Sequence, residues 1–173
     1  QTPVSIGYCL RYLPSAQKLK VLLDCDKIGT LYNAHFEIGQ YLPDWRPNKS
    51  YRDSVSAQKK LGGGALFELS HELDYAQWLL GPLHIKHSIL RKSKELALDV
   101  EDMADIISVT ESGAVATIHL DFLQRKAHRK CSFTGSEGRI EWDLILNQLT
   151  LVTATETSVL YRDTKWDKNQ MYL

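Results

Sequence analysis

The sequence is poor in cysteine, has no excess of either charge and lacks any long apolar run. Its 3 cysteines show no CxxC spacing, which argues against a disulfide framework and predicts reduced core thiols. Lys and Arg number 21, as do Asp and Glu, so nucleic acid is not an expected partner. No apolar run approaches the roughly 18 residues of a membrane helix, and the first residues do not resemble a signal peptide. We therefore expect a soluble, cytoplasmic protein with no membrane partner.

Sequence patterns that carry well-known chemistry are also missing. There is no GxSxG elbow, no P-loop and no GxGxxG, so the chain has no nucleotide-binding motif of its own. His71 is followed by Glu72, but no second histidine lies four residues after His71, as the HExxH type of zinc site requires. We therefore predict no metal site.

The length of the chain, 173 residues, suits one domain with a core of its own. Its first part predicts a β-rich segment over residues 3–9, a helix over 15–25 and a half-buried strand over 31–41. Further strands are expected over residues 83–92, 104–111, 114–125, 128–134, 139–145, 149–155 and 157–163, several of which alternate apolar and polar side chains. This order predicts an α+β fold with a large, mostly antiparallel sheet and helices packed on one face.

Residues 42–61 show no periodicity at all. Long segments without regular structure in compact domains are often functional. This one contains Trp45, Arg46, Tyr51 and Arg52, which are therefore candidate binding residues.

Residues 62–81, GGGALFELSHELDYAQWLLG, predict one helix that begins at three glycines. On a helical wheel, one stripe is apolar and is expected to face the core; its members are Leu66, Leu69, Leu73, Ala76 and Leu80. A second row lies almost opposite and contains Phe67, His71, Asp74 and Trp78. We therefore expect the helix to be covered on both sides, by the sheet and by a second domain, a ligand or a partner chain.

Two interpretations of His71 remain open. It could face the second cover as a functional residue, or it could form a structural hydrogen bond with Asp74 or Glu68 at helical spacing. The glycines also allow two interpretations. They could let a backbone or ligand approach closely and leave free N–H groups for an anion, or they could be a flexible entry after a loop.

Four stretches together resemble the second domain of the glucose–fructose oxidoreductase and inositol dehydrogenase family, also called Gfo/Idh/MocA. They are IGYCLRYLPS at 6–15, the loop with DWRP and YRDS, the stretch at 62–81, and FTGSEGRIEWD at 133–143. The resemblance implies a fold like the C-terminal domain of dihydrodipicolinate reductase, formed by residues 1–173 as a single domain truncated at both ends. It also implies a missing N-terminal Rossmann domain that binds NAD or NADP and carries the family's GxGxxG and Glu-Lys-Pro motifs, the latter with the catalytic lysine.

The resemblance further implies roles for individual residues. His71 matches the family histidine beside the nicotinamide, which acts as acid or base or polarises the reacting hydroxyl. The aspartate that many members have four residues earlier is Phe67 here, and the acid Glu68 stands three residues before His71. The residues assigned to the substrate are Arg11, Tyr51, Arg52, Glu68 and Tyr75. Those assigned to the cofactor are Trp45, Arg46, Lys60, Gly63 and Gly64.

The implied function is an NAD(P)-dependent oxidoreductase that acts on a hydroxyl or carbonyl group of a sugar or nucleotide sugar. This domain would bind the substrate and mediate assembly into a homodimer or tetramer through the outer sheet face, and it would be inactive alone. Two alternatives are a glycosidase of the same family that uses NAD for transient oxidation, and a non-catalytic relative with a dimerisation or regulatory role.

Overall fold

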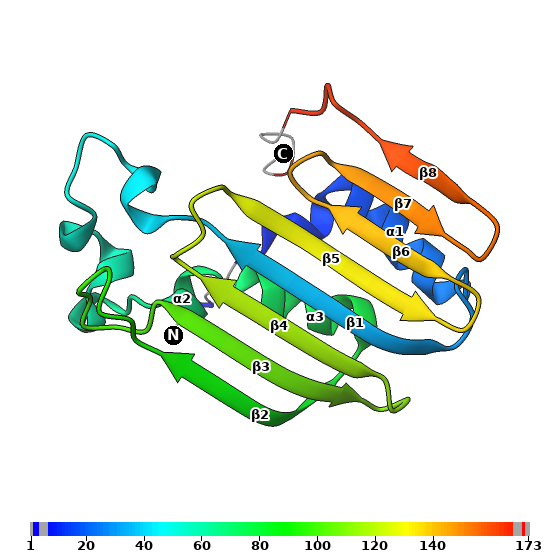
Figure 1. Cartoon of the computed structure of the whole chain (residues 1–173), viewed down its shortest axis with the longest axis horizontal. Coiled ribbons are helices and arrows are strands. Elements are labelled where there is room, and N and C mark those ends of the chain that lie inside the picture. Colours follow the sequence, from blue (N-terminus) through cyan, green and yellow to red (C-terminus); the bar gives the residue numbers. More distant parts are fainter. Residues whose placement is uncertain (1, 4–6, 168–170, 172–173) are drawn as a thin grey trace.

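The computed structural model describes residues 2–3, 7–167 and 171, and its main element is one large sheet. Eight strands lie in the order β2-β3-β4-β1-β5-β6-β7-β8 (Figure 1). Their bounds are β1 (Leu31–Gly39), β2 (Leu83–Arg91), β3 (Met103–Thr110), β4 (Val115–Asp121), β5 (His128–Gly135), β6 (Arg139–Asp143), β7 (Gln148–Val152) and β8 (Thr157–Arg162). Every neighbouring pair is antiparallel except β1 and β4. The predicted, mostly antiparallel sheet is confirmed.

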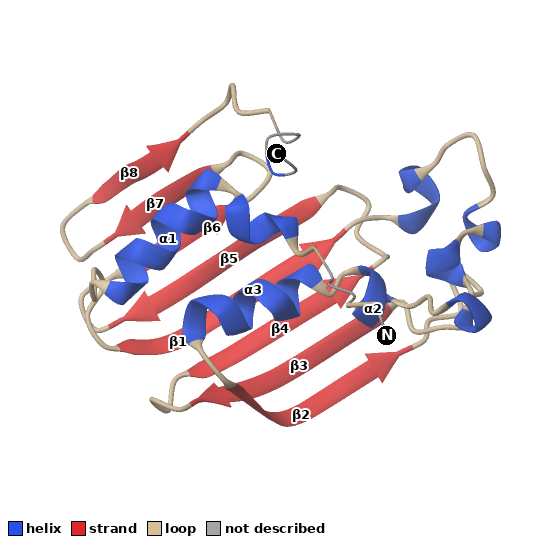
Figure 2. Cartoon of the chain, turned by 180° about the vertical axis from the view of Figure 1, so that it is seen from behind, coloured by secondary structure: helices blue, strands red, loops and turns tan. Residues whose placement is uncertain are grey.

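Helices cover only one face of this sheet (Figure 2). The α-helices are α1 (Pro14–Asp24), α2 (Ala65–Glu68) and α3 (His71–Leu80). The 3-10 helices are η1 (Cys9–Tyr12), η2 (Leu42–Trp45), η3 (Tyr51–Asp53), η4 (Val55–Ala57) and η5 (Lys59–Leu61). The last four belong to the segment after β1 and lie beyond the end of the sheet at which β1 and β4 finish (Figure 1). The α+β fold expected from the sequence is therefore the observed one.

The core lies between the sheet and the helices α1 and α3. In β1, Ala34, Phe36 and Ile38 are buried, whereas His35 and Glu37 between them are only partly buried. This alternation places the apolar side chains on the helix side of the sheet. Full burial of an apolar side chain of this size stabilises the fold by about 1.5–3 kcal/mol.

Two buried aromatic residues join the helices to the sheet. The Tyr75 ring of α3 packs against Phe36, with 5.8 Å between ring centroids, and against Trp142, with 5.3 Å. The Trp142 Nε1–H donates a hydrogen bond to Ser15 Oγ of α1 at 2.9 Å. Because the indole is fully buried, this bond satisfies an N–H group that would otherwise destabilise the fold.

The opposite face of the sheet has no helix over it and is called the open face below (Figure 1). His119 of β4 is bound there between two carboxylates, with Nδ1 2.6 Å from Asp105 Oδ1 and Nε2 3.0 Å from Asp121 Oδ2. The Gln124 amide extends this polar cluster, because it donates to both Asp121 and Glu37. The open face is therefore polar and charged at its centre.

The single helix expected over residues 62–81 is in fact two helices. α2 ends at Glu68, and residues 69–70 form a turn before α3 begins at His71. This break interrupts the predicted wheel, but the apolar stripe still packs on the core, with Leu69 and Ala76 buried and Leu66, Leu73 and Leu80 partly buried against it. Phe67 is 69% exposed, and the buried residues of α3 are Glu72, Tyr75, Ala76 and Leu79.

Two further expectations need correction. No strand forms in the described part of residues 3–9, of which residues 4–6 lie outside the described chain; η1 begins at Cys9. Of the cysteines, Cys131 is in the core, but Cys25 is exposed where α1 ends.

Within the described residues, no helix has both the length and the apolar character that crossing a bilayer requires.

Candidate functional site

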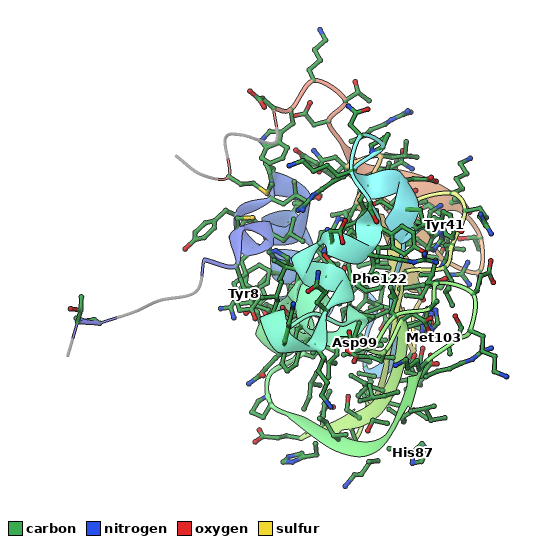
Figure 3. All side chains as sticks on the ribbon, turned by 90° about the vertical axis from the view of Figure 1, so that its left-hand side faces the viewer. Tyr8, Tyr41, His87, Asp99, Met103 and Phe122 are labelled. Atoms are coloured by element: carbon green, nitrogen blue, oxygen red, sulfur yellow. The ribbon has the colours of Figure 1, made fainter. Side chains whose placement is uncertain are left out.

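His71 begins α3 and lies toward the end of the sheet at which the long loop follows β1 (Figure 2). The Tyr8 ring packs edge-on against its imidazole, with 5.3 Å between centroids and 84° between planes. Figure 3, a view from this end, shows Tyr8 on the helix side of the molecule. The Nδ1 atom of His71 is buried and has no hydrogen-bond partner among the described residues. Nε2 does not share this burial, so it is the ring nitrogen that a bound molecule can reach.

Asp74, one turn after His71, is bound by an arginine. The Arg11 Nε–H donates to Asp74 Oδ2 at 2.8 Å, and Arg11 Nη2 donates to Oδ1. The Asp74 side chain is only 8% exposed, so this bidentate pair joins η1 to α3. The hydrogen bond with Asp74 raises the pKa of Arg11.

The interpretation of His71 as a structural residue bonded to Asp74 or Glu68 is wrong. Arg11 occupies both carboxylate oxygens of Asp74. Glu68 ends α2 with an exposed side chain, and the turn before α3 separates it from the imidazole. Arg11 therefore lies near the site as expected, but its guanidinium is bound to this chain's own carboxylate.

A second bidentate pair joins Glu72, the residue after His71, to β5. The Arg129 Nε–H and Nη2–H of β5 donate to the two Glu72 oxygens at 2.7 and 3.0 Å. The Glu72 side chain is 0% exposed. The Tyr75 hydroxyl donates to Glu72 Oε1 at 2.9 Å and lies 3.4 Å from Cys131 Sγ. Each buried polar atom of this cluster therefore has a partner.

The assignment of Tyr75 to the substrate is wrong, because its side chain is fully buried. Its hydroxyl is used by Glu72, and its ring lies between Phe36 and Trp142. Burial raises the pKa of the Tyr75 hydroxyl well above its ordinary value. Tyr75 is a core residue that supports the helix, and no ligand reaches it in this fold.

His71 is held as a neutral ring near pH 7. Burial lowers its pKa below the ordinary value, and the positive charge of Arg129 lowers it further. The carboxylates of Glu72 and Asp74 act in the opposite direction but are outweighed. A neutral imidazole can donate a hydrogen bond from one nitrogen and accept one at the other.

The glycines before α2 allow close approach of this chain's own groups. A Cβ on Gly63 would lie 2.3 Å from the carbonyl oxygen of Val55, and one on Gly64 would lie 2.2 Å from a carboxylate oxygen of Glu101. Gly64 also has a φ of 120°, which side chains with a Cβ rarely adopt. The glycines therefore let other groups approach the backbone closely, as one of the two interpretations proposed. The groups that approach are the Val55 carbonyl of the loop and the Glu101 carboxylate.

The expectation of free N–H groups at this helix start is wrong. The Gly64 N–H donates to Ser56 O, and the Ala65 N–H donates to Glu101 O, each at 3.0 Å. The Leu66 N–H donates to Glu101 Oε1 at 3.1 Å. These groups are used within the domain, so they do not form an anion site for a cofactor.

The loop after β1 folds around a cavity of about 350 Å³. Its lining residues are Leu42, Trp45, Arg46, Lys49, Ser50, Tyr51, Asp53, Ser54, Val55 and Ser56. Among the predicted binding residues, Trp45, Arg46 and Tyr51 therefore share one cavity. Arg52 and Lys60 are exposed and do not line it, and neither does His71.

Aromatic contacts hold this loop against the rest of the domain. The Trp45 ring packs edge-on against Phe122, with 5.4 Å between centroids, and Figure 3 shows the loop in front of Phe122. The Tyr51 hydroxyl donates to the carbonyl oxygen of Leu96 at 3.0 Å. The Arg52 guanidinium lies 5.4 Å from the centroid of the Tyr51 ring. Trp45 and Tyr51 therefore support the loop, while Arg46 and Lys49 are exposed cations at the cavity.

The described residues do not fit the pyrophosphate of a dinucleotide. The N–H groups at the start of α2 are already bonded. The first turn of α3 carries two acids, Glu72 and Asp74, which oppose an anion at that helix end. Within the same residues, no three His, Cys, Asp or Glu side chains are grouped to hold a metal ion.

Sequence reasoning missed Glu72 and Arg129. They are 57 residues apart in the chain and meet only because β5 passes beneath α3. One signal was present: once the helix starts at His71, Glu72 shares a face with Tyr75 and Leu79. A carboxylate on such an apolar face requires a buried partner.

Comparison with known proteins gives a family match. A model of the GFO/IDH/MocA C-terminal domain matches residues 16–141. No curated protein matches the chain by sequence. The family match begins within α1, includes the loop, the glycines, α3 and β1 to β5, and ends within β6.

Solved structures share the fold of nearly all of this chain. Levoglucosan dehydrogenase in complex with NADH and levoglucosan has a TM-score of 0.80 and 18% identity, over 95% of this chain and 52% of that chain. An inositol dehydrogenase homolog from Azotobacter vinelandii, complexed with NADH and myo-inositol, has a TM-score of 0.71 and 17% identity, over 94% and 43%. An NAD binding oxidoreductase from Klebsiella pneumoniae has a TM-score of 0.76 and 19% identity, over 95% and 48%. The chain thus spans about half the length of these proteins.

Proposed function

Because the chain belongs to the GFO/IDH/MocA family through its C-terminal domain, we propose that it is the substrate-binding and oligomerisation part of an NAD(P)-dependent oxidoreductase. The proposed substrate is a sugar or nucleotide sugar, whose hydroxyl or carbonyl group reacts. The observation that carries this proposal is His71, a neutral imidazole with one reachable nitrogen, held between two arginine–carboxylate pairs. The dehydrogenases with the same fold, which hold NADH with levoglucosan or myo-inositol, support it.

The chemistry assigned to His71 is contact with the reacting oxygen. Its Nε2 can form a hydrogen bond with a hydroxyl or carbonyl group and so act as acid or base or polarise that group. The pairs Arg11–Asp74 and Arg129–Glu72 fix the start of α3 to η1 and to the sheet, which keeps the imidazole in one orientation. Nicotinamide, when bound, supplies the hydride acceptor or donor. His71, held by these two arginine–carboxylate pairs, positions the reacting oxygen of the substrate.

The loop cavity is the proposed site for the rest of the substrate. Its lining combines the Trp45 and Tyr51 rings with the Arg46 cation and several hydroxyl groups. Aromatic faces and polar hydrogen-bonding groups together suit a sugar, and a cation suits a phosphate of a nucleotide sugar. Arg52 and Lys60 remain proposed contacts from the exposed side of the loop.

We propose that residues 1–173 act only as part of a longer protein. The backbone N–H donors at the start of α2 are already bonded within the domain, so we infer that the dinucleotide is held mainly elsewhere. The chain alone is then expected to transfer no hydride. Measurable reduction of NAD(P) by the 173-residue chain with a sugar would contradict this part of the proposal.

The test is a kinetic assay of the full-length protein with NAD or NADP and a panel of sugars and nucleotide sugars. Changes in nicotinamide absorbance report hydride transfer. His71→Ala is expected to lower turnover about 10²–10⁴-fold, whereas His84→Ala, at an exposed position of β2, is expected to leave it unchanged. Unchanged turnover in His71→Ala would remove His71 from the chemistry.

The same assay distinguishes the other functions. Release of sugar from a glycoside without lasting NADH would indicate a glycosidase. Absence of both signals would indicate a non-catalytic relative. Either result would replace the proposed oxidoreductase.

A further inference from the structure

The two nitrogens of the His71 ring have different surroundings. Nδ1 is buried and has no partner among the described residues, while Nε2 is the nitrogen that a ligand or water can reach. A neutral imidazole carries its proton on one of these nitrogens only. The surroundings of the ring therefore decide which hydrogen-bonding role His71 offers to a ligand.

The acids nearest to His71 on its own helix are both already bound. Asp74 accepts two hydrogen bonds from Arg11, and Glu72 accepts two from Arg129 and one from Tyr75. The remaining neighbour is the Tyr8 ring, which offers an edge contact; its hydroxyl lies 3.4 Å from Ser70 Oγ, to which it donates. Among the described residues, a proton on Nδ1 therefore has no acceptor.

A proton on Nδ1 would be a buried N–H group without an acceptor. Leaving a buried donor unsatisfied destabilises a protein by about 1–3 kcal/mol. A proton on Nε2 avoids this penalty, because that nitrogen reaches water or a ligand.

We propose that His71 carries its proton on Nε2 and donates a hydrogen bond from that nitrogen to the oxygen of the bound substrate. This hydrogen bond polarises the reacting hydroxyl or carbonyl group. The position of the proton follows from the contacts of the ring alone. That the bound molecule is a substrate rests on the function proposed above.

The experiment is nitrogen-15 NMR of the full-length protein labelled at histidine, near neutral pH and without cofactor. Long-range proton–nitrogen spectra distinguish a protonated from a bare ring nitrogen for each histidine. Comparison with His71→Gln identifies the signals of His71. We expect a protonated Nε2 and a bare Nδ1, and the reverse pattern or a fully protonated ring would overturn the proposal.

A variant of Arg11 tests the cause. Arg11→Gln releases Asp74, which lies three residues after His71 and can then accept a proton from Nδ1; we expect the Nδ1–H form and the pKa of His71 to increase. Arg11→Lys keeps a cation on Asp74 and should restore the original form. Arg139→Gln, which breaks an exposed pair with Glu141, serves as control. An unchanged ring in Arg11→Gln would overturn the explanation.

The NMR result is independent of catalysis. If the protein transfers no hydride but shows the Nε2–H form, the proposed function fails and the assignment of the proton stands. If the protein is active and Nδ1 carries the proton, the function stands and this inference fails.

Discussion

The Arg129 guanidinium of β5 binds both carboxylate oxygens of Glu72 on α3, at 2.7 and 3.0 Å. The Glu72 side chain is fully buried, and burial of Arg129 would lower its pKa if the charge of Glu72 did not raise it. This pair joins the helix that begins at His71 to the centre of the sheet.

Removing one member of this pair should destabilise the protein strongly. Glu72→Gln leaves the Arg129 charge buried without a counter-charge, and we expect the free energy of unfolding to decrease by about 3–5 kcal/mol. The measurement is urea unfolding followed by tryptophan fluorescence. Glu141→Gln, in an exposed pair with Arg139, should change the same quantity by less than about 1 kcal/mol.

The double variant Glu72→Gln/Arg129→Met provides a second check. It removes both buried charges, so it should be more stable than Glu72→Gln alone. If Glu72→Gln lowers the free energy of unfolding no more than the exposed control Glu141→Gln does, the pair does not support the helix.

Gly63→Ala should destabilise the start of α2. The new Cβ would lie 2.3 Å from the backbone oxygen of Val55, and the loop must shift to relieve this clash, at a loss of about 1–3 kcal/mol. Thermal unfolding measures the effect. Gly7→Ala is the matched control, because no heavy atom lies within 4 Å of a Cβ at that position. Equal unfolding temperatures for the two variants would contradict the packing described for Gly63.

The polar cluster of the open face should make stability depend on pH. The hydrogen bond to Asp121, with a further contribution from Asp105, raises the pKa of His119 to about 9. Burial alone would raise the pKa of Asp121, but the hydrogen bonds from His119, Gln124 and backbone N–H groups lower it overall. The folded protein therefore binds the His119 proton more tightly than the unfolded chain, where the pKa is about 6.5.

The sign of this effect follows from linkage. The stabilisation by His119 is complete below about pH 6.5 and is lost as the pH increases through about 9. Urea unfolding should be measured for wild type and His119→Asn between about pH 6.5 and 9. The difference between their free energies of unfolding should become smaller with increasing pH. His84→Asn, at an exposed position, should give a constant difference. A constant difference for His119→Asn would contradict the raised pKa.

The open face is the proposed homodimer contact. A stable contact between two copies needs about 800 Å² from each partner, and only this broad face of the sheet is free of helices (Figure 1). Light scattering across a concentration series should give a dimeric or tetrameric mass for the full-length protein. Ser132→Arg, on β5 at a partly buried position, should lower that mass, whereas Lys18→Glu on the exposed side of α1 should not. A monomeric wild type at every concentration would exclude this contact.

The fold was largely predictable because its signals are local. The alternation in residues 114–125 and 139–145 predicted β4 and β6 within a few residues of their observed bounds. Pro14 marked the start of α1, the first helix. Each of these signals depends on neighbours within a few positions, which the sequence displays directly.

The helix over residues 62–81 shows where local reasoning failed. The apolar pattern continues through residues 69–70, so the wheel joined two helices into one, and the family resemblance assigned Tyr75 to the substrate. In the fold, the turn before His71 rotates α3, and Tyr75 points into the core with Glu72. The direction of a side chain after such a break depends on packing against β1 and β5, which no local pattern contains.

The sequence by itself determined the class of fold, the family resemblance and the identity of His71 as the central candidate, because these depend on composition, spacing and short-range periodicity. Tertiary structure alone decided the partners of that histidine. Arg11 and Arg129 come from segments far apart in the chain and bind the two acids that follow His71. Since electrostatic and hydrogen-bond contacts require atoms within a few ångströms of each other, only the folded arrangement could leave Nδ1 without a partner and Nε2 within reach.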